Sequence, residues 1–291
     1  MPALLPQEGV YVCVGHIPLW ITYPDFVTPL WVGQAQREGA LNLRDLAPFW
    51  EPYHPQVGGT AGTFALRAHM LSQRPDAQWV GICQYRKFVT RERINKVAAL
   101  SYRVMDVTHR DSAALAQLGT QMLPTEGSFL FSRPRWFNNR RRSGGYLRQY
   151  ALSHRGEDLL RFAAEAASQG VLGAREIEHF MNEQLFVPGG IELGVFPTDF
   201  WLPNAAALES VMRACVERYP PAPQGYQARA WAFCGERLGS WLLLRHLGAT
   251  GARRFSPKRL GWLAPSHWSR RLVGQLNLVT EGDQTRYVGG T

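Results

Sequence analysis

The chain has 291 residues, of which 45% are hydrophobic and 12% are aromatic. This composition supports a large hydrophobic core and excludes an intrinsically disordered chain. Lysine and arginine outnumber aspartate and glutamate by 32 to 23, which gives a formal net charge of +9. Such a balance favours an anionic partner, whether a phosphate, a nucleic acid or an acidic membrane surface.

The cysteines and the termini exclude several classes of protein. Cys13, Cys83, Cys215 and Cys234 are far apart and form no CxxC pair, so their spacing suits neither a zinc site nor a disulfide framework. No apolar run reaches the roughly 18 residues of a membrane span, and the N-terminus lacks the basic and apolar regions of a signal peptide. We therefore expect a cytoplasmic protein with reduced core thiols.

The first predicted strand is the apolar run at residues 10–14, which ends at Gly15 and His16 and reads as a buried strand followed by a loop. Residues 18–55 are rich in proline, tryptophan and tyrosine and have little periodicity. We expect irregular structure there, with a short strand at residues 30–33. A loop of this length in a compact domain is usually functional.

A helix followed by a second buried strand comes next. Residues 61–74 have apolar side chains at helical spacing, with Thr60 or Thr63 as the expected cap. The run QWVGICQYRK at residues 78–87 is apolar and then ends in polar and cationic side chains. The order strand, helix, strand indicates an α/β sheet, and ligands of such sheets bind at the carboxyl ends of the strands.

The middle of the chain gives weaker signals. We predict a helix at residues 91–100, a strand at residues 102–107 and a helix beginning at Ser112. Residues 127–132 form another apolar β-run, and five arginines follow between residues 133 and 142. The arginine cluster predicts a loop, either solvated or binding phosphate.

The second half of the chain is mainly helical. We expect no internal repeat and a single domain at residues 1–250, followed by a basic, tryptophan-containing extension at residues 251–291. The predicted elements are helices at residues 146–169, 176–184, 204–219 and 226–247, and a glycine-broken hairpin at residues 186–195.

The better-defined catalytic motifs are absent from the sequence. It contains no GxGxxG, P-loop, GxSxG or HExxH segment, and no Asp-x-Asp of the kind that holds a divalent cation against a diphosphate. Arg86, Lys87 and the arginine cluster are the cations that would offset such a charge, because an arginine pairs with phosphate oxygens through two hydrogen bonds. We expect no metal and no other cofactor.

Two carboxylates are candidates for a general base. Asp199 lies among aromatic residues and Glu236 lies in an otherwise apolar helical segment. Apolar surroundings raise the pKa of a carboxyl group and so fit it for accepting a proton. For Glu236 the alternative is an ion pair with a neighbouring arginine of the same helix.

Four segments carry a family resemblance. They are VCVGHIP at residues 12–18, WVGICQYRK at 79–87, FPTDFWLPN at 196–204 and RAWAFCGERL at 229–238. In order and separation they resemble the motifs of the bacterial family known as the domain of unknown function 4422, whose characterised relatives are glycosyltransferases of polysaccharide assembly. The chain departs from the family pattern at Gln84 (usually His), Lys87 (usually Arg), Asp199 (usually Asn) and the pair Ala232 and Phe233 (usually Gly-Tyr).

The resemblance implies a GT-A-like, Rossmann-like nucleotide-sugar domain with a mixed sheet flanked by helices. It also implies transfer of a hexose, galactose or galactofuranose among the candidates, from a UDP-linked donor to a glycan or glycoconjugate acceptor. The residues that it places at the donor are His16, Gln84, Tyr85, Arg86, Lys87, Arg229 and Arg237, with Asp199 and Glu236 as the catalytic carboxylates.

Two other functions remain open from the sequence. The basic surface with interleaved aromatic residues would suit a nucleic-acid-binding protein, although no nucleic-acid-binding motif is present. The departures at Gln84 and Asp199 would suit a catalytically inactive, carbohydrate-binding relative. For a transferase with a lipid-linked acceptor, the basic extension would rest on the anionic inner face of the membrane.

Overall fold

The computed structural model of the chain describes residues 6–17, 23–85, 87–92, 97–99, 103–105, 118–125, 129–136, 138–139, 142–219, 225–249 and 260–265. Within them the chain is an α/β fold with a mixed sheet flanked by helices, as predicted. The main sheet has eight strands in the order β13-β8-β14-β5-β4-β1-β2-β3, and β13 also pairs with β4.

The centre of the sheet is the parallel pair β1 (Gly9–Gly15) and β4 (Trp79–Gln84), in which Cys13 lies opposite Cys83. Every residue of β1 is buried, because alternate side chains enter two different apolar clusters. This pattern is the one expected of a strand covered on both faces. The valines at 10, 12 and 14 join the larger cluster on the helical side, and Tyr11 and Cys13 join the smaller cluster on the other side.

The other strands extend the sheet in both directions. On one side β2 (Val27–Trp31) and β3 (Leu41–Asn42) continue the parallel pairing. On the other side β5, β8, β13 and β14 add antiparallel pairs and one parallel pair, β8 with β14. Their bounds are Lys87–Thr90 for β5, Leu130–Ser132 for β8, Gly194–Pro197 for β13 and Leu260–Pro265 for β14.

Three small sheets lie outside the main one, and each has two antiparallel strands. They pair β6 (Val97–Ala99) with β7 (Arg103–Met105), β9 (Arg135–Trp136) with β12 (Leu185–Phe186), and β10 (Asn138–Asn139) with β11 (Arg142–Ser143).

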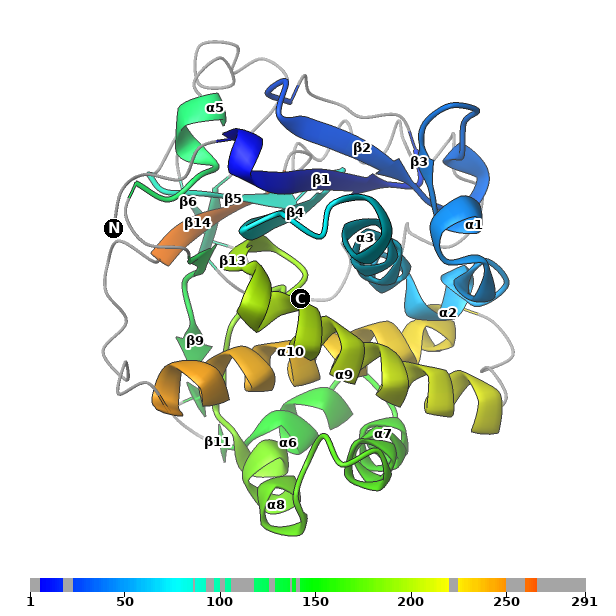
Figure 1. Ribbon diagram of the computed structural model, residues 1–291. Helices are drawn as coiled ribbons and strands as arrows, with labels where there is room; N and C mark the ends of the chain where they lie inside the picture. Colours follow the sequence, from blue (N-terminus) through cyan, green and yellow to red (C-terminus); the bar gives the residue numbers. More distant parts are fainter. Residues whose placement is uncertain are drawn as a thin grey trace.

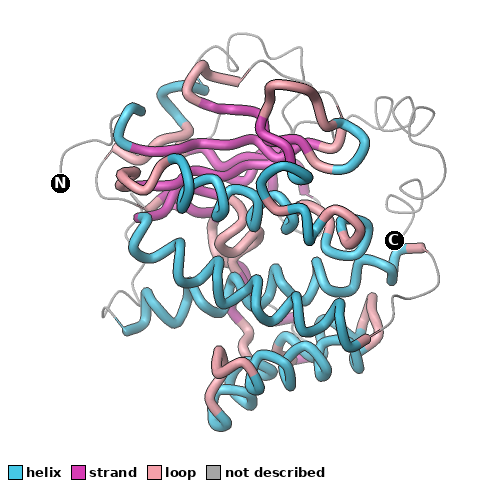
Figure 2. Tube along the Cα trace, turned by 45° about the vertical axis from the view of Figure 1, so that its right-hand side comes forward, coloured by secondary structure: helices cyan, strands magenta, loops and turns pink. Residues whose placement is uncertain are grey.

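The long helices are stacked on one side of the sheet (Figures 1 and 2). Helix α3 lies next to the strands, α9 and α10 follow, and α6, α7 and α8 are farthest away (Figure 1). The helices are α1 (Leu43–Leu46), α2 (His54–Val57), α3 (Thr60–Gln73), α5 (Leu118–Gln121), α6 (Tyr146–Ala151), α7 (Gly156–Ser168), α8 (Ala174–Asn182), α9 (Thr198–Arg218) and α10 (Ala230–Ala249). Short 3-10 turns occupy Pro6–Glu8, Gly33–Ala35, Pro48–Trp50 and Tyr226–Arg229.

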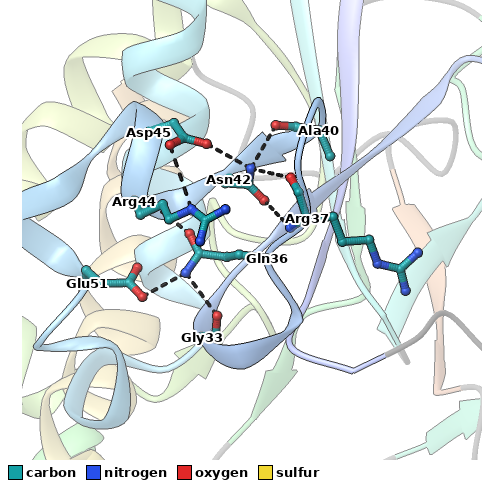
Figure 3. A network of polar contacts seen from close by, with 8 residues as sticks. All are labelled: Gly33, Gln36, Arg37, Ala40, Asn42, Arg44, Asp45 and Glu51. Carbon is teal, nitrogen blue, oxygen red and sulfur yellow. Dashed lines mark hydrogen bonds and ion pairs between the residues drawn. The ribbon is translucent and has the colours of Figure 1, made fainter.

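Residues 23–55 have more structure than the predicted irregular segment. They contain β2, which replaces the strand expected at 30–33, and also β3, α1 and the start of α2. Side-chain amides hold this segment together: Gln36 Nε2 donates to Gly33 O (2.9 Å) and Glu51 Oε1 (2.7 Å), and Asn42 Nδ2 donates to Asp45 Oδ2 (2.8 Å) (Figure 3). The amides donate hydrogen bonds to a backbone carbonyl and to two carboxylates. Hydrophobic periodicity in the sequence does not reveal hydrogen bonds of this kind.

Several predicted elements are confirmed within a few residues. The strands expected at 10–14, 102–107 and 127–132 correspond to β1, β7 and β8, and the helices expected at 61–74, 176–184 and 226–247 correspond to α3, α8 and the 3-10 turn with α10. The helix expected at 204–219 begins earlier, at Thr198, and includes Pro203. The buried strand expected in the run at 78–87 is confirmed as β4, which ends at Gln84; Lys87 then begins β5, which pairs with β4 as an antiparallel hairpin.

Other predictions are wrong. Residues 97–99, expected to be helical, form β6. The helix expected at 146–169 is two helices: α6, which buries Tyr146 and Tyr150, and α7, which buries an apolar face around Phe162. Of the helix predicted from Ser112, residues 112–117 lie outside the described part of the chain, and residues 118–121 form α5.

The hairpin predicted at 186–195 is also wrong. Strand β12 pairs with β9, and β13 pairs with β4 and β8. The chain between them turns at Gly189 and Gly190, whose φ angles are +84° and +51°. Glycine adopts this left-handed backbone without steric cost. The turn therefore sends the two strands to different partners.

The expected C-terminal extension contributes to the fold, because β14 lies between β8 and β5 in the main sheet. Residues 251–259 and 266–291 are outside the described part, and so is most of the predicted lipid-contacting surface. Among the helices that the structure describes, none combines the length and the apolar character needed to cross a membrane.

The packing of α3 on β1 gives a stability prediction. A Cβ atom at Gly62 would lie 2.4 Å from Cγ1 of Val14, so we expect Gly62→Ala to lower the free energy of unfolding by about 1–3 kcal/mol through overpacking. At Gly248, also helical, a Cβ atom meets nothing within 4 Å. We expect Gly248→Ala to raise the free energy by about 0.5–1 kcal/mol through helix propensity. Urea unfolding of both variants measures the difference, and equal midpoints would contradict the packing.

Candidate functional site

The carboxyl edge of β1 and β4 gathers the first group of candidate residues. Because the two strands are parallel and in register, their ends at Gly15 and Gln84 lie at one edge of the sheet. His16 and Tyr85 follow directly, with ring centroids 4.6 Å apart in an edge-to-face arrangement. The backbone N–H of Tyr85 donates to Val14 O (2.7 Å), which fixes the turn. The structure thus brings His16, Gln84 and Tyr85 together, as predicted.

A glycine pair brings the N-terminus of α3 to this edge. Gly58 has a φ of +55°, and a Cβ atom there would lie 2.8 Å from Nη2 of Arg229. A Cβ atom at Gly59 would lie 2.8 Å from Nε2 of Gln84. The guanidinium of Arg229 and the amide of Gln84 therefore lie against the backbone that enters α3. The N-terminus of a helix carries partial positive charge, so this edge is suited to an anion.

His54 lies beside the same cation. Its ring centroid is 6.5 Å from that of His16. Burial, and then the charge of Arg229, lower the pKa of His54 to about 4. His54 is consequently neutral at physiological pH, and the positive charge of this part of the edge resides on Arg229.

Helix α10 contributes a carboxylate to the edge. Gly189 N–H donates to Oε1 of Glu236 (2.9 Å), and a Cβ atom at Gly190 would lie 2.5 Å from the backbone nitrogen of Ser240. The Gly189–Gly190 turn is thus packed directly on α10. Arg229 and Glu236 are seven residues apart, about two helical turns, so they lie on one side of this segment.

A buried acid that the sequence did not indicate completes the cluster. Thr60 Oγ1 donates to Oε2 of Glu192 (2.8 Å), and among the described residues Oε1 of Glu192 has no hydrogen-bond partner. The pKa of Glu192 is raised to about 8, chiefly by burial; the Thr60 hydrogen bond opposes this rise, the charge of Glu236 adds to it and the charge of Lys87 opposes it. The one feature of the sequence that could have pointed to Glu192 is its place as a single acid inside the apolar run GGIELG.

This bond also corrects the predicted cap of α3. The N-cap is Gly59 and makes no side-chain cap hydrogen bond, and the hydroxyl of Thr60 is directed to Glu192. Lys87, at the start of β5, is close enough for its charge to act on Glu192. The first turn of α3, the end of β4, the start of β5 and the Gly189 turn are thereby linked through Glu192.

Two predicted residues lie elsewhere. Asp199 is exposed in the first turn of α9, where Oδ1 accepts from the N–H of Phe200 (2.7 Å). The preceding residue, Thr198, donates its N–H to Gln78 O at the start of β4 (3.0 Å). Since β4 rises about 3.3 Å per residue, Asp199 lies at the opposite edge, about 17–20 Å from Gln84. The structure therefore does not bring Asp199 to the site.

Arg237 is buried on another side of α10. It donates to Phe233 O (2.7 Å) and to Oε1 of Gln149, and its guanidinium lies 4.8 Å from the ring centroid of Tyr150. These contacts join α10 to α6 and pair the two terminal nitrogens of the buried guanidinium, while among the described residues its Nε has no hydrogen-bond partner. Arg86 is outside the described residues, as are Arg140 and Arg141 of the arginine cluster, so their positions are not assigned.

The arrangement suits anion binding. Lys87, Arg229 and the N-terminus of α3 supply positive charge, and the charges of Lys87 and Glu236 both act on Glu192, which is bound to Thr60 in the first turn of α3. Among the described residues no group of three or more histidine, cysteine, aspartate or glutamate side chains is placed to hold a metal ion.

Comparison with known proteins gives one structural relative. No protein-family model and no curated protein matches the sequence. The solved structure of the WbbM bifunctional glycosyltransferase in its apo form matches with a TM-score of 0.67 at 13% sequence identity. The match covers 89% of this chain and 45% of that one, so the chain spans about half the length of that relative. The likeness shows the fold alone, an α/β domain of the GT-A-like kind.

The pairing of His54 with Arg229 gives a prediction. In Arg229→Gln we expect the pKa of His54 to rise from about 4 toward its ordinary value of about 6.5, without reaching it, because burial persists. Since the folded pKa lies below the unfolded one, the stability contributed by neutral His54 is present above about pH 6.5 and is lost toward pH 4. NMR titration of the His54 ring measures its pKa. Arg218→Gln is the control, because Arg218 pairs with Glu165. An unchanged His54 pKa would contradict the geometry.

Proposed function

We propose that the protein is a glycosyltransferase that moves a hexose from a UDP-linked donor to a glycan or glycoconjugate acceptor. The observation that carries the proposal is the meeting of Arg229, Lys87 and Glu236 at the N-terminus of α3, on the carboxyl edge of the sheet. In open α/β sheets this edge is where nucleotides bind. The GT-A-like fold supports the same placement.

The donor diphosphate would lie between the N-terminus of α3 and the two cations. Arg229 is held against Gly58 at the start of this helix, where its fork can form two parallel hydrogen bonds to phosphate oxygens. The helix adds the partial positive charge of its N-terminus. We propose that these fixed positive groups offset the diphosphate without a metal ion.

The carboxylate of Glu236 would act as the general base. It would take the proton of an acceptor hydroxyl as that oxygen forms its bond to the anomeric carbon. The bond from the anomeric carbon to the diphosphate oxygen breaks, and the electron pair leaves with the nucleoside diphosphate. The developing negative charge on the leaving group is stabilised by Arg229, Lys87 and the helix N-terminus.

Binding measurements test the proposed donor. We expect UDP-galactose or UDP-glucose to raise the melting temperature of the protein in the presence of EDTA. We expect Arg229→Ala to weaken the affinity for these sugar nucleotides at least tenfold, because a phosphate pairing is lost. Thermal shift and calorimetry measure both. Arg218→Ala is the matched control, because Arg218 pairs with Glu165 on α7.

Three results would oppose this scheme. A strict requirement for manganese would contradict the metal-free part. Salt-sensitive binding of oligonucleotides without binding of sugar nucleotides would favour the nucleic-acid alternative. Binding of sugar nucleotides without transfer or hydrolysis would identify an inactive relative.

The base is tested by turnover. We expect Glu236→Gln to lower the rate of sugar transfer or donor hydrolysis about 100-fold or more while UDP-galactose still binds, because the amide keeps the shape but accepts no proton. Asp199→Asn should leave the rate unchanged, since Asp199 lies at the opposite edge. Radiolabelled or coupled assays of donor consumption measure both variants. Equal rates for wild type and Glu236→Gln would exclude Glu236 as the base.

A further inference from the structure

Glu192 combines features that core packing does not require. Its side chain is 5% exposed, and it lies among the elements that form the donor edge. One carboxyl oxygen is bound by the Thr60 hydroxyl at 2.8 Å, and among the described residues the other has no hydrogen-bond partner. Leaving a buried polar atom unpaired is unfavourable. An apolar side chain would fill this place without that penalty.

The groups that face Glu192 come from three packed elements. Helix α3 supplies the neutral hydroxyl of Thr60, α10 supplies the carboxylate of Glu236, and β5 supplies the ammonium of Lys87. The opposing charges of Glu236 and Lys87 act on Glu192 in opposite directions, so burial decides its protonation. With the proton bound, the edge keeps its positive character; without it, a second carboxylate faces the start of α3.

We propose that Glu192 is a positioning residue whose bound proton keeps this edge able to accept the donor diphosphate. The proposal rests on the function proposed above. In the protonated form Glu192 adds no charge beside Lys87 and the N-terminus of α3. In the ionised form it repels the diphosphate in a buried environment, where such repulsion is weakly screened.

Linkage gives the proposal a measurable consequence. If only the protonated form of Glu192 accepts the diphosphate, donor binding above about pH 8 must be accompanied by proton uptake. The affinity then falls as the pH rises through this value, with a limiting slope of about tenfold per pH unit. Both phosphates of a sugar nucleotide are ionised throughout this range, so the diphosphate itself does not supply the effect.

The test is calorimetric binding of UDP-galactose between pH 6.5 and 9 in buffers of different ionisation enthalpy. For the wild type we expect affinity about tenfold weaker at pH 9 than at pH 7, and proton uptake near pH 8.5. Glu192→Gln keeps the shape and a hydrogen-bond acceptor for Thr60 but cannot ionise. We expect its affinity to be flat over this range, without proton uptake.

Two further variants keep the test decisive. Thr60→Val removes the hydrogen bond that lowers the pKa of Glu192, so its loss of affinity should begin at higher pH than in the wild type. Glu209→Gln is the control, because Glu209 is bound to Trp50 and Arg67 away from the edge, and it should follow the wild-type profile. Circular dichroism shows whether each variant is folded.

The outcomes separate the two proposals. Binding of UDP-galactose with the same pH profile in wild type and Glu192→Gln would overturn the role of Glu192 and leave the donor site intact. No binding of UDP-galactose, UDP-glucose or UDP by folded protein at pH 7 would overturn the proposed function and this inference with it.

The unliganded protein provides a readout that needs no sugar nucleotide. Because the folded pKa of Glu192 is raised, the folded state keeps a proton that the unfolded chain releases above about pH 4.5. The free energy of unfolding contributed by this group therefore falls as the pH rises from about 4.5 to about 8 and then stays level. Glu192→Gln should remove this fall, and urea unfolding at pH 5 and pH 8.5 measures it. An identical pH dependence in both proteins would overturn the inference.

Discussion

The parallel pairing of β1 with β4 is the constraint on which the site depends. It places Gly15 and Gln84 at one edge, and it is held by strands whose side chains are buried on both faces. Helix α3 packs against β1, and β4 leads into the hairpin with β5. Both α3 and β5 therefore reach this edge of the sheet. A shift of register by one residue would move every side chain to the opposite face and separate His16 from Tyr85.

Glycines then determine how closely other elements approach this edge. Gly58 and Gly59 bring the start of α3 against Arg229 and Gln84, and the Gly189–Gly190 turn lets a loop rest on the backbone of α10. The positive φ angles at Gly58, Gly189 and Gly190 suit glycine and few other residues. The charged groups of the site are consequently carried by backbone segments packed against one another, and their spacing is set by the fold.

The sequence indicates part of this arrangement. The apolar runs of β1 and β4 predict buried strands and their polar carboxyl ends, and six predicted residues meet at one edge: His16, Gln84, Tyr85, Lys87, Arg229 and Glu236. Periodicity cannot give the direction of a neighbouring strand, so the antiparallel run of β13 and the resulting place of Asp199 are not predictable. Glu192 escapes notice because its partner Thr60 is 132 residues away.

The charge balance of the edge explains why a buried acid is tolerated there. With Glu192 protonated, Lys87 and Arg229 face one carboxylate, Glu236, and the start of α3 adds further positive character. With Glu192 ionised, two carboxylates face two cations, and the edge no longer favours an anion. Holding a neutral acid in the core reduces stability at neutral pH, because the unfolded chain would release that proton. Such a cost persists where the group serves binding or catalysis, and the proposed role of Glu192 in binding the donor diphosphate would offset it.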